Sequence, residues 1–347
     1  MQYTTNLAYH IKRYIQIYLP NIKGLSQNTI YSYRDNLTIF LRYCESAKNM
    51  KIEKMSLEQI TPELITDFLD YLESTMKYSA SSRNQRLAAL RTFFRYLMHD
   101  DVTYISLTQD VLSIPMKKTK NTIPEHLSLS GIELLLKQPD TNNEHEFRDL
   151  VLMAFMYDTG ARVQECIDLT IGDIKLMSPA TVILHGKGNK TRIVPLMENT
   201  KKLLKSYLNP VLSLTEKKCQ PAFVNKYGDK LTRAGISYIL NKYATKAHQE
   251  NYDIMPNHIH PHILRHSRAM HLLQSGVNLV YIRDLLGHSS ITTTEIYARA
   301  DTEIKRKAIE NASPIIQTNV AGEWENNKKL LDWLKWGCGH ILGLRRE

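Results

Sequence analysis

Residues 258–297 constrain the possible fold more than any other stretch, because residues that begin and end helices recur along them. Pro261 suits the first turn of a helix, where a backbone N–H is not needed. Gly276 stands where the residue just past the end of that helix is expected, and Asn278 can cap the next helix. Gly287 is placed to end this second helix. The sequence therefore predicts two short consecutive helices here.

A third helix is expected to follow and to carry a tyrosine. Thr292 and Glu295 have the spacing of a capping box, so the helix that they begin includes Tyr297. In the first of the three helices, His262 and Arg265 lie about one turn apart and share a face. A phenol close to cations and imidazole rings suits one reaction, the attack of a tyrosine on a phosphodiester.

The first 115 residues show the apolar periodicity of an all-helical domain. The first helical stripe is predicted to stop at Pro20, because proline lacks the N–H that a helix interior needs. Ser26 and Thr61 are placed to cap the second and third helices, and Pro62 takes the first position of the third. A fourth helix is predicted over 82–98, with an inner face formed by Leu87, Leu90, Phe94 and Leu97.

An exposed linker is expected after this helical domain. Residues 114–124 contain two prolines and three lysines without any periodicity, a composition typical of a solvated connection. We therefore divide the chain into a helical domain over 1–115, a basic linker over 116–124, a second domain over 125–300 and a C-terminal helical tail over 301–347.

The second domain is predicted to be mixed, with helices and one pair of strands. Ser130 is placed to cap a short helix, and Gly160 ends a longer helix over 146–159. Two strands over 181–184 and 192–195 are joined by a glycine-rich turn.

The charge of the chain favours an anionic partner. Lysine and arginine exceed aspartate and glutamate by 45 − 35 = 10, and the sequence pI is near 9.2. Nucleic acid is the leading partner for so basic a protein, although a solvated basic surface is the alternative. No run approaches the ~18 apolar residues of a membrane span. The four cysteines lack CxxC spacing and are typical of reduced thiols in a cytoplasmic protein.

Four segments resemble, in the expected order, the signature motifs of the tyrosine recombinase (phage integrase) family: TGARVQECIDL, HGKGNKTRIVPL, HPHILRHSRAMHLLQSG and LLGHSSITTTEIYAR. The resemblance covers about residues 125–300, and four ordered motifs are far more specific than one. It implies a mainly α (α+β) fold, in which a helical SAM-like core-binding domain precedes a mostly helical catalytic domain with a small antiparallel β-sheet. It also implies a site-specific DNA recombinase that uses no metal or nucleotide cofactor.

The resemblance implies that two arginines bind the phosphate and that one lysine serves the leaving group. Arg162 and Arg265 match the pair that holds the scissile phosphate, and Lys187 matches the lysine of the β-hairpin. The chemistry agrees, because phosphoryl transfer gathers negative charge that the planar fork of arginine binds well. The departing 5′ oxygen needs a proton, which Lys187 can deliver.

The nucleophile and its neighbours are assigned in the same way. Tyr297 matches the attacking tyrosine, while His262 and His288 match the two histidine positions. A phenol with a pKa of about 10 needs a nearby base, and His262 can serve. Glu165 matches an acidic position that orients the site, and His266 is expected to pack or hydrogen-bond beside it. A phosphotyrosine keeps the bond energy, so strands can be rejoined without an external energy source.

Other basic residues are candidates for DNA contacts, although a solvated face is the commoner role for such side chains. These residues are Arg86, Arg91, Arg95, Lys117, Lys118, Lys120, Lys190 and Arg192. Tyr281, by contrast, is predicted to lie in the core, because it falls within an apolar helix stripe with Leu285.

A histidine cluster at 258–266 raises the alternative of a metal site. His262 and His266 have the i, i+4 spacing of a zinc-binding helix. The segment HILRH lacks the glutamate of HExxH, however, and Arg265 between the histidines repels a cation. We expect no metal.

The tail carries an apolar stripe that needs a covering surface. It includes Trp324, Trp333 and Trp336, separated by leucines. In the resembling family this segment often docks on a neighbouring protomer, which implies exchange between protomers and a homotetramer on two DNA sites. Packing of the tail on its own domain is the alternative.

Two other functions compete with recombination. A type IB topoisomerase shares the chemistry but relaxes DNA as a monomer, and the short chain and its motifs favour recombination over it. A DNA-binding protein with a decayed site is the third possibility, and the complete set of motif residues argues against it.

Overall fold

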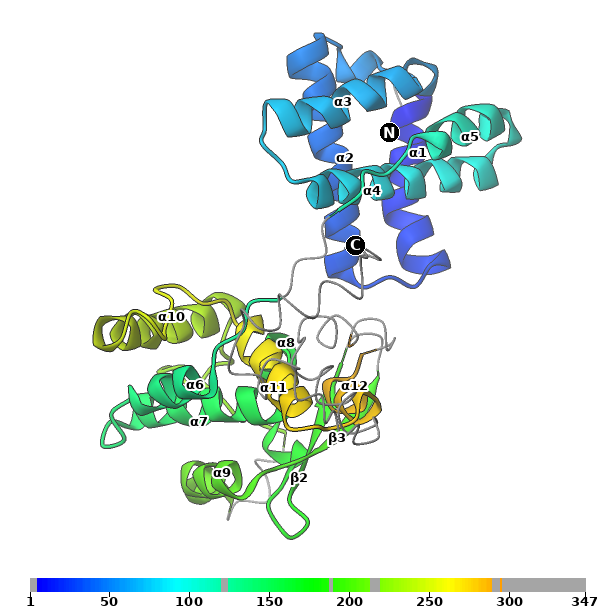
Figure 1. Ribbon diagram of the computed structural model, residues 1–347. Coiled ribbons are helices and arrows are strands. Elements are labelled where there is room, and N and C mark those ends of the chain that lie inside the picture. Colours follow the sequence, from blue (N-terminus) through cyan, green and yellow to red (C-terminus); the bar gives the residue numbers. More distant parts are fainter. Residues whose placement is uncertain (1–4, 120–123, 187–189, 213–218, 289–293, 295–347) are drawn as a thin grey trace, which may run out of the picture. The chain divides into compact units, whose positions relative to one another are not determined.

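The computed structural model describes residues 5–119, 124–186, 190–212, 219–288 and 294. Contacts between Cα atoms divide the chain into two compact units, Met1–Asn121 and Thr122–Glu347. Both are mainly helical, and the second holds a small antiparallel sheet, so the expected fold class is confirmed (Figure 1). Within the described residues, no helix is long and apolar enough to cross a membrane.

The N-terminal unit is built from helices around one apolar core. Its α-helices are α1 (Asn6–Arg13), α2 (Gln27–Lys48), α3 (Pro62–Ser74), α4 (Ala80–Asp100) and α5 (Ile105–Ser113). The predicted cap of α3 is confirmed, since the Thr61 hydroxyl accepts from the Leu64 amide at 3.2 Å. The predicted inner face of α4 is also confirmed, because Leu87, Leu90, Phe94 and Leu97 are all buried.

The prediction that the first helix stops at Pro20 is wrong. The chain continues from α1 as a π-helix over Tyr14–Ile22, with Pro20 inside it. The wider turn pairs each amide with the carbonyl five residues back, as when the Lys23 amide donates to the Tyr18 carbonyl at 2.9 Å. Tyr14 and Leu19 are fully buried on this segment. Their burial favours continuing the helix, and the wider turn accommodates the proline ring.

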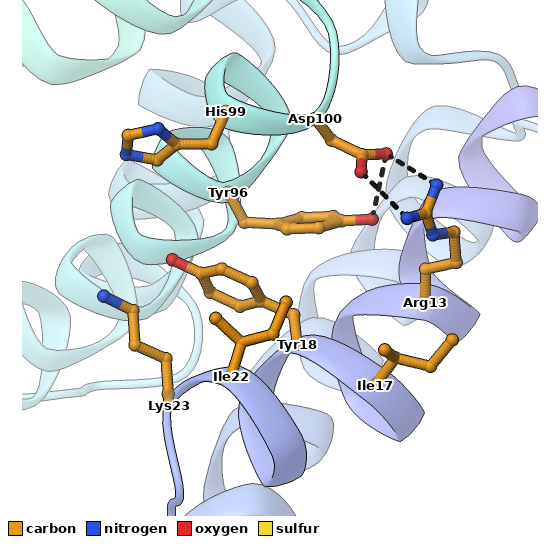
Figure 2. Close-up of a pocket in the computed structure, with 8 residues that line it drawn as sticks. All are labelled: Arg13, Ile17, Tyr18, Ile22, Lys23, Tyr96, His99 and Asp100. Carbon is orange, nitrogen blue, oxygen red and sulfur yellow. Dashed lines mark hydrogen bonds and ion pairs between the residues drawn. The ribbon is translucent and has the colours of Figure 1, made fainter.

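A charged cluster joins α1 to α4. Asp100 pairs with His10 at 3.1 Å and with Arg13 at 3.2 Å, and the Tyr96 hydroxyl donates to it at 3.3 Å. Burial and then the Asp100 carboxylate raise the pKa of Tyr96, which stays a donor. Figure 2 shows Arg13 and the Tyr96 hydroxyl meeting at Asp100, with the Tyr18 ring packed against the Tyr96 ring. These residues line a pocket of about 360 Å³.

The start of the linker is fastened to α4. The Asn84 amide donates to the Lys117 carbonyl at 2.7 Å, and the Lys117 amide donates back to Asn84 at 3.0 Å. The Lys117 ammonium also pairs with Glu73, and Arg83 donates to the Pro115 carbonyl at 3.4 Å. These contacts fix the direction in which the chain leaves the unit.

The second unit packs its helices around the sheet and one large core. Its helices are α6 (Leu129–Lys137), α7 (Glu144–Thr159), α8 (Val163–Asp168), α9 (Glu198–Leu212), α10 (Arg233–Glu250), α11 (His262–Gln274) and α12 (Leu279–Leu286). The sheet order is β1-β2-β3, with β1 (Ile174–Lys175), β2 (Thr181–His185) and β3 (Thr191–Pro195) all antiparallel (Figure 1). The two predicted strands are therefore confirmed, and the two-residue β1 was not predicted.

The cap of α6 was assigned to the wrong serine. Ser128, not Ser130, caps the helix, and its hydroxyl accepts from the Gly131 amide at 3.1 Å. Both serines have a hydroxyl that can cap a helix, so the sequence alone does not choose between them. In the structure the helix begins after Ser128 and buries Ile132 and Leu135 in the core. The predicted end of α7 is confirmed, because Gly160 is left-handed with φ of 61°.

The predicted boundaries of α11 and α12 are confirmed. Gly276 is left-handed after α11, the Asn278 side chain accepts from the Val280 amide at 2.9 Å, and Gly287 is left-handed with φ of 63° after α12. The prediction that Tyr281 is a core residue is wrong, because it is 71% exposed. The buried stripe of α12 runs through Ile282 and Leu286, and one residue of offset turns a side chain about 100° around a helix.

Two predictions fall outside the described residues. They are the third helix, from Thr292 through Tyr297, of which only Thr294 is described, and the tail over 301–347 with its tryptophans.

Candidate active site

Arg162 stands at the junction between α7 and α8. Gly160 turns the chain at the end of α7, and Arg162 is the N-cap residue of α8. One turn into α8, Glu165 accepts a hydrogen bond from the Arg162 backbone amide at 2.7 Å. The predicted supporting residue thus holds the backbone of the predicted phosphate-binding arginine.

Glu165 is a buried carboxylate shared by two arginines. Its side chain is 2% exposed, and its Oε1 accepts from Nη1 of Arg162 at 2.9 Å and of Arg192 at 2.7 Å. Its Oε2 accepts from Nη2 of Arg192 at 2.8 Å. Burial alone would raise the pKa of Glu165, but the bonds from Arg192 and then Arg162 outweigh it and lower that pKa. Glu165 is therefore ionised.

Three arginines converge on the last carbonyls of α12. Arg192 Nε donates to the Leu285 carbonyl at 2.8 Å, and Arg265 Nη2 donates to the Leu286 carbonyl at 2.6 Å. Arg162 Nη2 donates to the carbonyl of Gly287 at 3.2 Å. The carbonyl end of a helix carries partial negative charge, so it favours gathering cations there. Three consecutive peptide groups thus hold guanidinium groups from three different elements.

Arg265 is the more deeply placed of the predicted phosphate-binding pair. It projects from the first turn of α11, is 4% exposed, and also donates to the Gly160 carbonyl at 2.6 Å. Arg162 is more accessible, with its side chain 32% exposed. Of the two arginines, Arg265 is therefore buried, and Arg162 is accessible to solvent.

The histidines at the start of α11 form a group beside this basic site. The ring centroids of His260, His262 and His266 lie 6.2 to 6.4 Å apart. Partial burial, followed by the charge of Arg265, lowers the pKa of His262, and burial followed by His262 lowers that of His266 to about 4. Both rings are neutral near pH 7, so His262 is available as a proton acceptor.

His288 follows Gly287 directly at the end of α12. Its Nδ1 lies 3.0 Å from the Thr294 hydroxyl. Burial and then Arg265 lower the pKa of His288 to about 4, so the ring is a neutral hydrogen-bonding group rather than a cation. Lys187 and Tyr297, the other two predicted catalytic residues, lie outside the described residues.

The candidate DNA contacts differ in accessibility. Arg95, Lys118 and Lys190 are exposed, and Lys120 lies outside the described residues. Lys117 pairs with Glu73. Arg86 donates to Asn36 at 2.6 Å, and Arg91 donates to the carbonyl groups of Leu112, at 2.9 Å, and of Ile114.

The buried position of Arg192 was not predicted from the sequence. It was expected at the DNA surface, yet its side chain is 11% exposed and is held by Glu165 and the end of α12. The available signal was strand alternation, because a residue two positions before the apolar Val194 shares its inward face.

The described residues contain no cluster of three or more His, Cys, Asp or Glu side chains that could hold a metal ion. The potential ligands of 258–266 are histidines beside Arg265, whose charge opposes a cation. The described groups at the site are guanidinium cations and neutral imidazole rings.

The chain is similar to known proteins along most of its length. Residues 125–303 match the phage integrase family, and residues 11–101 match the N-terminal SAM-like domain of phage integrases. Tyrosine recombinase XerD of Staphylococcus epidermidis is 33% identical over 82% of this chain and 92% of its own length. Tyrosine recombinase XerC of Bacillus subtilis is 30% identical over 89% and 97%. The XerH recombinase in a pre-cleavage complex with its difH substrate has a TM-score of 0.62 and 25% identity, covering 82% of this chain and 79% of that one.

Proposed function

The chain belongs to the phage integrase family and is a site-specific DNA recombinase that cleaves and rejoins strands, and we propose that six of its residues carry out the chemistry. These residues are Arg162, Lys187, His262, Arg265, His288 and Tyr297. The observation that carries the proposal is the convergence of Arg162, Arg265 and His288 at the end of α12.

Arg162 and Arg265 bind the scissile phosphate. Each guanidinium has five N–H donors, so Arg162 can hold the protein and still present donors to phosphate oxygens. Negative charge accumulates on the non-bridging oxygens as the phosphorus is attacked, and fixed cations stabilise it without reorganising. The neutral ring of His288 adds a hydrogen bond at the same phosphate.

Tyr297 is the nucleophile, and His262 is the base that accepts its proton. The lowered pKa of His262 keeps that ring neutral before the reaction, as a base must be. The phenolic oxygen attacks phosphorus, the bond from phosphorus to the 5′ oxygen breaks, and Lys187 protonates the departing oxygen. The product is a 3′-phosphotyrosyl linkage that a 5′ hydroxyl of another strand reverses.

Double-stranded DNA is the partner, and a homotetramer on two DNA sites is the working assembly. The net charge of +10 and the exposed Arg95, Lys118 and Lys190 support binding to phosphates. The similar XerH recombinase was crystallised on a DNA substrate. Exchange of two strand pairs needs four nucleophiles, which four copies supply.

The test is trapping of a covalent complex. Nicked duplex DNA from the sequence flanking the gene is incubated with the protein, and products are separated on a denaturing gel. We expect an adduct with the wild type that is lost in Tyr297→Phe and kept in Tyr281→Phe, a matched control at an exposed tyrosine of α12. An adduct that survives in Tyr297→Phe would overturn the assignment. Strand exchange is tested by following the transfer of a labelled strand from one duplex to another. The tetramer is tested by crosslinking the protein while it is bound to DNA.

A further inference from the structure

Arg192 lies on the inward face of β3, which is unusual for a charged residue. Val194 on the same face is buried, whereas Ile193 between them is 69% exposed. The strand register places Arg192 opposite the buried Leu184 of β2. An inward charge costs free energy unless it is paired and hydrogen-bonded, so its contacts indicate its role.

All three guanidinium nitrogens of Arg192 donate hydrogen bonds to the protein. Nη1 and Nη2 reach the two oxygens of Glu165 at 2.7 and 2.8 Å, and Nε reaches the Leu285 carbonyl at 2.8 Å. Only an arginine supplies this fork together with a third donor at its base. Arg192 therefore ties the β-hairpin strand to α8 and to the end of α12.

The close fit at Gly287 places Arg192 against the end of α12. A Cβ added at Gly287 would lie 3.0 Å from both Cδ and Nη1 of Arg192. Gly287 also accepts the bond from Arg162 and precedes His288. The aliphatic stem and head of Arg192 thus support the peptide group that holds Arg162.

The pairing with Arg192 controls how Glu165 can hold Arg162. With both oxygens engaged by Arg192, Glu165 takes one side-chain nitrogen and the backbone amide of Arg162. Without Arg192, Glu165 would be a buried carboxylate that draws both outer nitrogens of Arg162 into a bidentate pair. That pair would withdraw the donors that a phosphate needs.

We propose that Arg192 is a positioning residue for strand cleavage, which keeps Arg162 directed at the phosphate by occupying Glu165. The inference rests on the proposed function of Arg162. It assigns Arg192 no contact with DNA.

The first experiment separates positioning from DNA binding. At saturating concentrations of the duplex that the wild type cleaves, Arg192→Gln should lower the single-turnover cleavage rate about 100-fold, the scale of a misplaced reacting group. Its affinity for that duplex should stay within about twofold, because no DNA contact is lost. Arg192→Lys should recover only part of the rate. Lys175→Gln, which removes an exposed cation from β1, is the matched control and should cleave like the wild type.

A double variant decides whether Arg192 acts through Glu165. When Glu165→Gln removes the carboxylate charge, adding Arg192→Gln should change the cleavage rate little, because nothing remains to draw Arg162 away. This comparison holds even if Arg192→Gln alone does not fold, since the double variant buries no unpaired charge. A further large loss of rate when Arg192→Gln is added to Glu165→Gln, or full cleavage by Arg192→Gln, would overturn the inference. Absence of a Tyr297-dependent adduct in the wild type would instead overturn the proposed function.

Discussion

At the scale of single residues, burial and hydrogen bonding together decide which groups of the site carry charge. Glu165 stays ionised because two arginines bind it, and His266 and His288 stay neutral because burial and nearby cations disfavour their protonation. The result is a region of fixed positive charge with neutral hydrogen-bonding rings around it. Such a region suits a phosphate that gains negative charge during the reaction.

We predict that the free energy of unfolding falls as the pH is lowered from 6.5 towards about 4. Histidines in the unfolded chain titrate near 6.5, whereas His266 and His288 in the folded chain titrate at about 4. Between these values the unfolded chain binds more protons, so acid stabilises the unfolded state. Urea unfolding at a series of pH values measures the effect, and His266→Asn should flatten the profile. An unfolding free energy that is constant across this window would contradict the prediction.

At the scale of elements, the ends of α7 and α12 meet. Gly160 ends α7 and Leu286 ends α12, and a Cβ added at Gly160 would lie 2.6 Å from the Leu286 side chain. The carbonyl groups of both residues bind Arg265. The close approach of two helix ends therefore builds the pocket for that arginine.

Gly160→Ala should destabilise the protein more than Gly276→Ala does. Both glycines are left-handed, with φ of 61° and 81°, and each alanine should cost roughly 1–2 kcal/mol in backbone strain. Gly276 has no heavy atom within 4 Å of an added Cβ, whereas Gly160 meets Leu286. Urea unfolding compares the two variants, and equal losses would show that the helix ends do not approach as described.

Local signals were enough to predict most helix ends but not every contact. Gly160, Gly276, Asn278 and Gly287 were predictable because caps and left-handed residues act within a few positions. The π-helix through Pro20 and the short α5 and α8 depend on burial against other elements, which propensity does not encode.

Only those residues of the candidate site that stand at motif positions could be predicted from the sequence. Arg162, Glu165 and Arg265 were placed by motif spacing, and the structure brings them together. The burial of Arg192 and the exposure of Tyr281 were not predicted. Each depends on which residues of one short strand or helix face the core. Tertiary packing, rather than composition, determines which face of such an element is buried.

At the scale of the whole molecule, the two units have separate cores, and the chain is fastened to its own unit on either side of the linker. Lys117 is held by Asn84 of α4. On the other side, the Leu127 amide donates to the Ser267 hydroxyl of α11 at 2.8 Å, and Leu127 is buried. The chain is therefore held at Lys117, near the start of the basic linker, and at Leu127, just beyond its end.

The salt dependence of DNA binding should separate surface arginines from structural ones. Arg95→Gln should reduce the slope of log affinity against log salt by about 0.9, the amount for one lost phosphate contact. Arg91→Gln should leave that slope unchanged and lower stability, because Arg91 donates to the carbonyl groups of Leu112 and Ile114. Fluorescence anisotropy over a salt series measures both. Equal slope changes in the two variants would contradict the distinction.

The end of α12 also matters for anyone who rebuilds this protein. A different arginine donates to each of the carbonyl groups of Leu285, Leu286 and Gly287. A reporter fusion or a circular-permutation break between these residues would therefore remove the support of three guanidinium groups at once. The exposed turn at Tyr227 and Gly228 belongs to another loop and is the better opening for an inserted tag.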